Sequence, residues 1–183
     1  MRKQRRLYLT IGLLSAVLAA TCSLLACDLS RESQEVLVKV NGDPILKEDV
    51  DALYEQYERT GIDYNEIVTN SIRDLVFIQW GRKMGVSVSD EEVEDMIHDL
   101  QESYHAYYDI YLEQYGRSEM KEKFRNILFY NKSLEVMEEW IKKDLSEDQW
   151  DTPDKMNEAI ERRIDELVVT AQVQYCNGSE NSK

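Results

Sequence analysis

Short stretches with a two-residue period lie near both ends of a chain whose middle has a helical period. Val36, Val38 and Val40 recur at alternate positions near the N-terminus, and apolar side chains alternate with polar ones over residues 169–176. Alternation of this kind predicts β-strands. Because a lone strand leaves its backbone groups without partners, we expect the two terminal strands to pair and to hold the intervening helices together.

Turn-forming residues follow the first strand directly. Asn41 and Gly42 supply the positive φ angles of a tight hairpin turn. Pro44 lacks a backbone donor, so the returning segment at residues 45–46 is predicted to be short and to lie at a sheet edge. Helical spacing of apolar residues begins at Lys47, and Gly61 is expected to end that first helix.

Capping residues bound the next two predicted helices. Asp63 with Glu66 is expected to form a capping box, and Gly85 to stop the helix that follows. The apolar residues of this helix cover more than half of its circumference, which predicts that it is central and buried. Ser89 with Glu92 predicts a second capping box and a further helix.

The remaining helices complete a mainly α fold. Gly116 is expected to break the helical pattern, with Ser118 as the cap of a long helix that ends near Asp144. Thr152 followed by Pro153 predicts the start of the last helix. Only 7 Gly and 2 Pro occur in 183 residues, which argues against an all-β sandwich. We therefore predict a single helical domain of about five to six helices, with a small β-ribbon that pairs the N-terminal and C-terminal strands.

The first 26 residues differ from the rest of the chain. Residues 1–6 carry four positive charges, and residues 7–26 carry none. This is the layout of a secretory signal, although twenty uncharged residues are also enough for a permanent membrane anchor. The sequence Leu-Leu-Ala-Cys that ends at Cys27 resembles the lipobox of bacterial lipoproteins. This resemblance implies cleavage after Ala26 and a lipid on Cys27, while the uncleaved anchor is the alternative.

The predicted organisation has four parts and an acidic overall charge. The parts are a lipoprotein signal peptide (1–26), a polar tether (27–35), one domain (36–176) and a disordered tail (177–183). Loss of the leader removes four positive charges and no negative ones, so the net charge changes from −14 to −18. Such a chain lacks the basic surface that nucleic acids require. A lipid on Cys27 would leave Cys176 unpaired, whereas a free Cys27 could form a disulfide with Cys176.

The sequence contains no pattern typical of catalysis or of a bound cofactor. Phosphate-binding loops, HExxH and CxxC motifs are absent. His98 and His105 are seven residues apart, or ~10.5 Å along one helix, which is too far for one metal ion unless the helix breaks between them. The acidic residues between Asp90 and Glu102 lack the loop that wraps calcium, so we interpret them as a solvated helix face. We expect no enzyme activity, no metal and no cofactor.

A tyrosine-rich stretch is the strongest candidate for a polypeptide-binding surface. Its five phenol rings are predicted to lie along one helical stripe. They belong to Tyr104, Tyr107, Tyr108, Tyr111 and Tyr115. Tyrosine combines a wide apolar area with a polar tip and few side-chain torsions, so it suits adaptable recognition. The alternatives are that the rings complete the core against the long helix, or that some do each.

Four segments resemble, in order, the N-terminal chaperone domain of the SurA and PrsA family. They are residues 38–45 (VKVNGDPI), 85–93 (GVSVSDEEV), 112–116 (LEQYG) and 167–175 (LVVTAQVQY). Two departures from the family pattern occur: Leu46 stands where the family usually has a Thr or Ser cap, and no stretch has room for a parvulin-type prolyl isomerase module. The resemblance therefore implies binding of unfolded chains without isomerase chemistry.

These observations predict a chaperone-like lipoprotein on the extracytoplasmic face of a bacterial cell membrane. It would hold unfolded or extended secreted polypeptides in an apolar cleft, with the tyrosines as contacts. The alternative is a dedicated envelope scaffold that uses the same fold to bind one specific partner. A homodimer that exchanges terminal strands is compatible with both functions.

Overall fold

The computed structural model describes residues 35–176. The predicted leader (1–26), the lipidation site Cys27, the tether up to residue 34 and the tail (177–183) lie outside the described residues. Within residues 35–176 the chain forms five α-helices and one three-stranded sheet, which confirms the predicted mainly α fold.

The sheet joins the two ends of the described chain. Its strands are β1 (Val36–Val40), β2 (Asp43–Leu46) and β3 (Val173–Tyr175), with β1 in the middle and both pairings antiparallel. Val38 lies opposite Tyr175, and Val38 and Val40 are both fully buried. Asn41 and Gly42 have positive φ angles of 52° and 96° in the β1–β2 turn. The predicted hairpin and the predicted pairing of the terminal strands are therefore confirmed.

Five helices follow between β2 and β3. They are α2 (Lys47–Tyr57), α3 (Tyr64–Lys83), α4 (Asp90–Ser103), α5 (His105–Asp144) and α6 (Pro153–Thr170), with 3-10 turns at Glu58–Thr60 and Glu147–Gln149. The capping box of Ser89 and Glu92 and the Thr152 cap are confirmed. Asp63 caps α3 by accepting from the N–H of Asn65, which differs from the predicted box with Glu66. No helix within residues 35–176 combines the length and the apolar character needed to cross a bilayer.

The C-terminal stretch with a two-residue period is helical for longer than predicted. Helix α6 continues through Thr170, so Val169 lies in the helix and is exposed. The strand β3 begins only at Val173. The reason is that β1 turns away after Val40, the partner of Val173, so no neighbouring strand is available for residues 169–171. The backbone groups of those residues therefore form hydrogen bonds with nearby residues instead of with a neighbouring strand.

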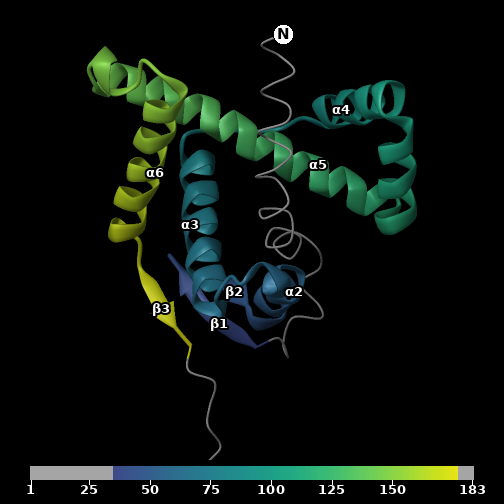
Figure 1. The fold of residues 1–183 in the computed structure, drawn as a ribbon, viewed down its shortest axis with the longest axis horizontal. Coiled ribbons are helices and arrows are strands. Elements are labelled where there is room, and N and C mark those ends of the chain that lie inside the picture. Colours follow the sequence, from purple (N-terminus) through teal and green to yellow (C-terminus); the bar gives the residue numbers. More distant parts are fainter. Residues whose placement is uncertain (1–34, 177–183) are drawn as a thin grey trace, which may run out of the picture.

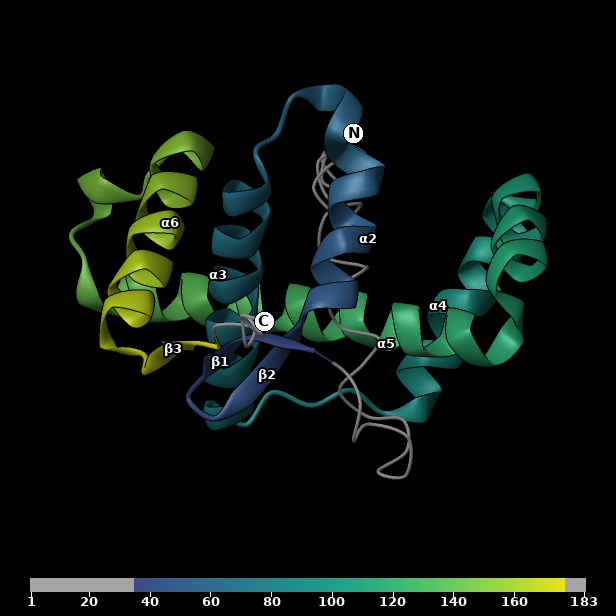
Figure 2. The same ribbon diagram turned by 90° about the horizontal axis from the view of Figure 1, so that it is seen from below.

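Apolar side chains form three separate clusters. The sheet cluster lies among the strands, α2 and the part of α3 up to Val76, whereas the junction cluster lies where the rest of α3 meets α5 and α6. The arm cluster lies between α4 and α5. Helix α3 contributes to the first two clusters and is the central buried helix, as predicted. Figures 1 and 2 show α5 crossing the molecule, with α6 near one end and α4 near the other.

Candidate functional site

Residues 90–127, which comprise α4 and α5 as far as Ile127, form what we call the arm; Gly116 divides α5 into a first part and a second part. The buried members of its core are Val93, Ile97, Tyr108, Met120, Phe124 and Ile127. None of these residues belongs to the sheet cluster or to the junction cluster. Figure 1 shows that the arm projects from the rest of the molecule at the end of α5 that is distant from α6. The arm therefore has a core of its own and a surface set apart from the sheet.

Two residues with non-helical backbone angles shape the arm. Tyr104, at φ −144° and ψ 52°, separates α4 from α5. Gly116, at φ 69° and ψ 166°, kinks α5, and a residue with a Cβ rarely adopts such a φ. The predicted break at Gly116 is confirmed, but helical structure resumes directly after it rather than at a Ser118 cap.

Two of the five candidate tyrosines, Tyr108 and Tyr111, contribute to the core of the arm, and Tyr115 lies beside Tyr111. Tyr108 is only 8% exposed. Tyr111 stacks on Phe124 with ring centroids 5.9 Å apart. The ammonium Nζ of Lys123 lies 4.2 Å from the ring centroid of Tyr115. Because Gly116 lies between these partners, its kink lets the first segment of α5 fold back on the second.

The other two tyrosines are exposed. Tyr104 and Tyr107 have 40% and 61% of their surfaces exposed, and their rings meet edge to face with centroids 6.4 Å apart. Ile110, one helical turn after Tyr107, is 55% exposed. We call Tyr104, Tyr107 and Ile110 the aromatic face of the arm. It gathers half of the large apolar side chains that are exposed within residues 35–176.

The prediction of one stripe with five rings is therefore wrong. Tyr104 lies at the break between two helices, so the helical spacing that relates it to Tyr108 does not apply. Tyr107 and Tyr108 are adjacent, and about 100° of helical rotation turns one ring outward when the other is buried. Ile110 was not predicted as a site residue. The sequence feature that could have identified Ile110 as exposed is its position, three residues after Tyr107 and nearly opposite Tyr108 around the helix.

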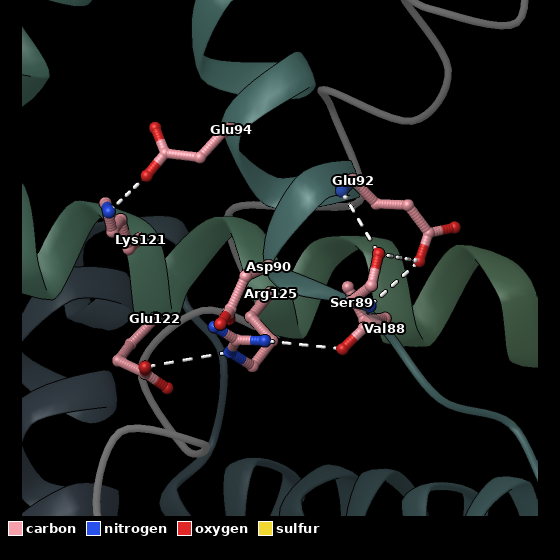
Figure 3. Close-up of polar contacts among 8 residues, drawn as sticks. All are labelled: Val88, Ser89, Asp90, Glu92, Glu94, Lys121, Glu122 and Arg125. Carbon is pink, nitrogen blue, oxygen red and sulfur yellow. Dashed lines mark hydrogen bonds and ion pairs between the residues drawn. The ribbon is translucent and has the colours of Figure 1, made fainter.

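Cations from the second part of α5 attach the start of α4. Lys132 Nζ lies 2.5 Å from a carboxylate oxygen of Glu92, and an Arg125 guanidinium nitrogen lies 2.6 Å from Asp90 Oδ1. Arg125 also donates to the Val88 carbonyl, as Figure 3 shows. Lys132 and the capping bonds with Ser89 lower the pKa of Glu92 to about 2. The acidic first turn of α4 is therefore bound to α5 as well as solvated.

The two histidines lie on different helices. His98 is in α4 and pairs with Glu102 at 3.3 Å, whereas His105 is the first residue of α5. The helix does break between them, at Tyr104, so the spacing along a single helix does not apply. No group of three or more His, Cys, Asp or Glu side chains within residues 35–176 has the geometry to hold a metal ion.

A second set of ionisable groups lies at the junction of α3, α5 and α6. Arg73 of α3 pairs with Glu161 and Asp165 of α6. Burial raises the pKa of the neighbouring Asp74 to about 6, which the Arg73 charge only partly offsets. Burial also raises the pKa of Tyr130, and the Asp74 charge raises it further. Asp74 can take up a proton in mild acid, but these groups join helices at the junction and do not line the arm.

No model of a known protein family matches this chain, and no curated protein matches it. Function is therefore inferred from the residues and their arrangement. The similarity of four segments to the SurA and PrsA family and the apolar cleft stay predictions.

Proposed function

We propose that this chain is a chaperone-like lipoprotein that holds unfolded or extended polypeptides outside the cytoplasm. The observation that carries the proposal is the aromatic face, where three large apolar side chains are exposed together on an arm with its own core. A lipid on Cys27 would anchor the protein to the bacterial membrane. The four segments that resemble the SurA and PrsA family support the same function.

Exposed aromatic and aliphatic side chains suit weak binding of many sequences. Burial of apolar surface contributes roughly 25 cal/mol per Å², whichever apolar side chain of the client supplies that surface. Tyrosine adds little cost, because its ring is rigid and only two torsions are fixed on binding. The aromatic face therefore favours apolar segments as a class over any one sequence.

The charge of the chain favours holding over aggregation. Exposed apolar patches usually promote self-association. A net charge of −18 after loss of the leader makes loaded molecules repel one another, and this keeps them soluble. Holding requires no covalent step, so the proposed function needs neither a catalytic residue nor a cofactor.

Suppression of aggregation tests the proposal. We expect the full chain to reduce light scattering by two unrelated unfolded proteins, and the triple variant Tyr104→Ser/Tyr107→Ser/Ile110→Ser to lose most of this effect. The matched control is Met84→Ser/Val169→Ser, which removes exposed apolar side chains outside the arm and should act like the wild type. Equal protection by the triple variant, with unchanged circular dichroism, would exclude the aromatic face as the binding surface.

Two further measurements separate the remaining alternatives. A dedicated scaffold would protect neither unfolded protein and would retrieve a single partner from envelope extracts. Mass spectrometry of the mature N-terminus distinguishes a lipid on Cys27 from an uncleaved leader, since only the first gives a chain that begins at a modified Cys27.

A further inference from the structure

The acidic side chains of the arm are concentrated before Gly116, and its lysines and arginines all follow it. Residues 90–116 contain nine carboxylates and neither lysine nor arginine. Three of the carboxylates pair with cations of the second part of α5, and Glu102 pairs with His98. The other five have no ion-pair partner within residues 35–176: Glu91, Asp95, Asp99, Asp109 and Glu113. Residues 90–116 therefore keep a negative field that the cations after Gly116 do not fully neutralise.

One of these five carboxylates, Glu113, borders the aromatic face, and a second, Asp109, adjoins Glu113. Tyr107, Ile110 and Glu113 follow one another at intervals of three residues in α5, so they are neighbours along one side of the helix. Asp109 lies four residues before Glu113 and is its neighbour in the same way. All four side chains are exposed. An extended segment that covers Tyr107 and Ile110 would therefore place its adjoining side chains beside Glu113, with Asp109 next along the helix surface.

We infer that the aromatic face selects extended polypeptide segments in which lysine or arginine residues adjoin apolar ones. This inference rests on the proposed function and names its substrate class. Glu113 and the adjoining Asp109 would attract the cations and would repel segments rich in Asp or Glu. Exposed tyrosine rings also attract ammonium and guanidinium groups through their faces. The arm itself contains such a contact, between Lys123 and Tyr115.

The same charges favour a polypeptide over a bilayer as the occupant. Bacterial membrane surfaces that carry anionic lipids would be repelled by an arm without free basic groups over residues 90–116. A cationic client gains from both parts of the surface, because its apolar side chains cover the aromatic face and its charges meet Asp109 and Glu113.

Binding of matched peptides to the full chain tests the inference. Three labelled peptides share their apolar residues and carry Lys, Ser or Glu at the intervening positions, and their affinities are measured by fluorescence anisotropy. We expect the affinity order Lys, Ser, Glu, with the preference for Lys reduced in high salt. Asp109→Asn/Glu113→Gln should weaken binding of the Lys peptide about three- to tenfold and leave the Ser peptide unchanged. Glu55→Gln/Glu135→Gln, the same change of charge on exposed residues of α2 and the second part of α5, should alter neither.

Each outcome supports or overturns a distinct statement. In one outcome, Asp109→Asn/Glu113→Gln binds the Lys peptide as tightly as the wild type does, while Tyr107→Ser/Ile110→Ser no longer binds the Ser peptide. This result overturns the selection by charge and retains the proposed function. Failure of all three peptides to bind the wild type overturns the proposed function as well. In a further outcome, the wild type binds no peptide but binds zwitterionic phosphatidylcholine vesicles, and Tyr107→Ser/Ile110→Ser abolishes the vesicle binding. This result would mean that the aromatic face binds a bilayer.

Discussion

The backbone N–H of Gln172 donates to the side-chain Oδ1 of Asn41 at 2.9 Å, although 131 residues separate the two in the chain. The N–H of Asn41 donates in return to the Gln172 carbonyl at 2.8 Å. The side-chain Nδ2 of Asn41 also donates to Gln79 of α3 at 2.7 Å, and Gln79 donates to the Val40 carbonyl. Asn41 therefore connects the hairpin turn, the start of the last strand and the central helix.

Substitution of Asn41 should loosen the junction of the two chain ends. Asn41→Ala loses both side-chain bonds and is strained at the positive φ of 52°, so we expect it to lower the free energy of unfolding by about 2–3 kcal/mol. Asn41→Gly fits the turn but lacks the side chain, and should cost about 1–2 kcal/mol. Urea denaturation followed by circular dichroism measures both. Wild-type stability of Asn41→Gly would mean that the bonds to Gln172 and Gln79 contribute nothing net.

Helices α3 and α5 approach closely at Gly81, so a larger side chain at this position should be unfavourable. A Cβ built at Gly81 would lie 2.3 Å from Ser133 Oγ and 3.2 Å from the Phe129 ring of α5. Gly81→Ala gains about 1 kcal/mol in helix propensity but overpacks this contact by about 1–3 kcal/mol. We expect a net loss of about 1 kcal/mol in denaturant unfolding.

The Ser133→Ala background provides the control for this prediction. Removal of Oγ relieves the shortest contact, so Gly81→Ala should be neutral or stabilising there. The double-mutant cycle should give a coupling of about 1 kcal/mol or more between the two positions. Additive effects would show that α3 and α5 separate freely at this crossing.

Because of Asp74, the free energy of unfolding should decrease as the pH rises from about 4 to about 6. Its pKa is raised by burial from 3.8 to about 6 in the folded protein, so the folded state binds the proton more tightly than the unfolded state does. The stability lost to this group therefore develops between about pH 4 and pH 6 and is complete above that range. Asp74→Asn stays neutral, so we expect it to be about 2–3 kcal/mol more stable than the wild type at pH 7 and nearly equal at pH 4. Urea denaturation at both pH values measures this difference. If Asp74→Asn differed from the wild type by the same free energy at pH 4 and pH 7, the raised pKa of Asp74 would be contradicted.

Glu92 should have the opposite pH dependence, confined to the arm. Its pKa is lowered by Lys132 and Ser89 to about 2, so its contribution is present above about pH 4.5 and is lost as the pH falls toward 2. We expect Glu92→Gln to increase amide hydrogen exchange over residues 90–103 at pH 7 without affecting the sheet. Glu91→Gln is the matched control, since Glu91 has no ion pair within the described residues. Equal exchange in the two variants would mean that the pair with Lys132 does not hold α4 in place.

Local signals in the sequence predicted most of the fold. Ser89 with Glu92, Thr152 with Pro153, and Asn41 with Gly42 each specify backbone geometry within a few residues, and the structure has all three features. The pairing of the terminal strands was also predictable, because neither strand could form a sheet alone. These predictions succeeded because each depends on neighbours in sequence or on the absence of any alternative partner.

The features that were missed depend on distant contacts. The end of α6 at Thr170 depends on where β1 turns, and β1 lies near the opposite end of the described sequence. The separation of the tyrosines depends on the break at Tyr104 and on the fold-back at Gly116, which brings Phe124 against Tyr111. Periodicity assigns a residue to one side of a helix, but it does not say whether another segment covers that side.

Separate tests of Tyr111 and Tyr107 should distinguish core rings from exposed ones. Tyr111 is half-buried and stacks on Phe124, so Tyr111→Ser should lower the free energy of unfolding of the arm by about 2–4 kcal/mol. Tyr107 is 61% exposed, and Tyr107→Ser should change stability by less than about 0.5 kcal/mol while it weakens peptide binding. Hydrogen exchange over the arm measures the first effect and anisotropy the second. If Tyr107→Ser destabilised the arm as much as Tyr111→Ser does, Tyr107 would belong to the core, and the binding surface would have to be sought elsewhere.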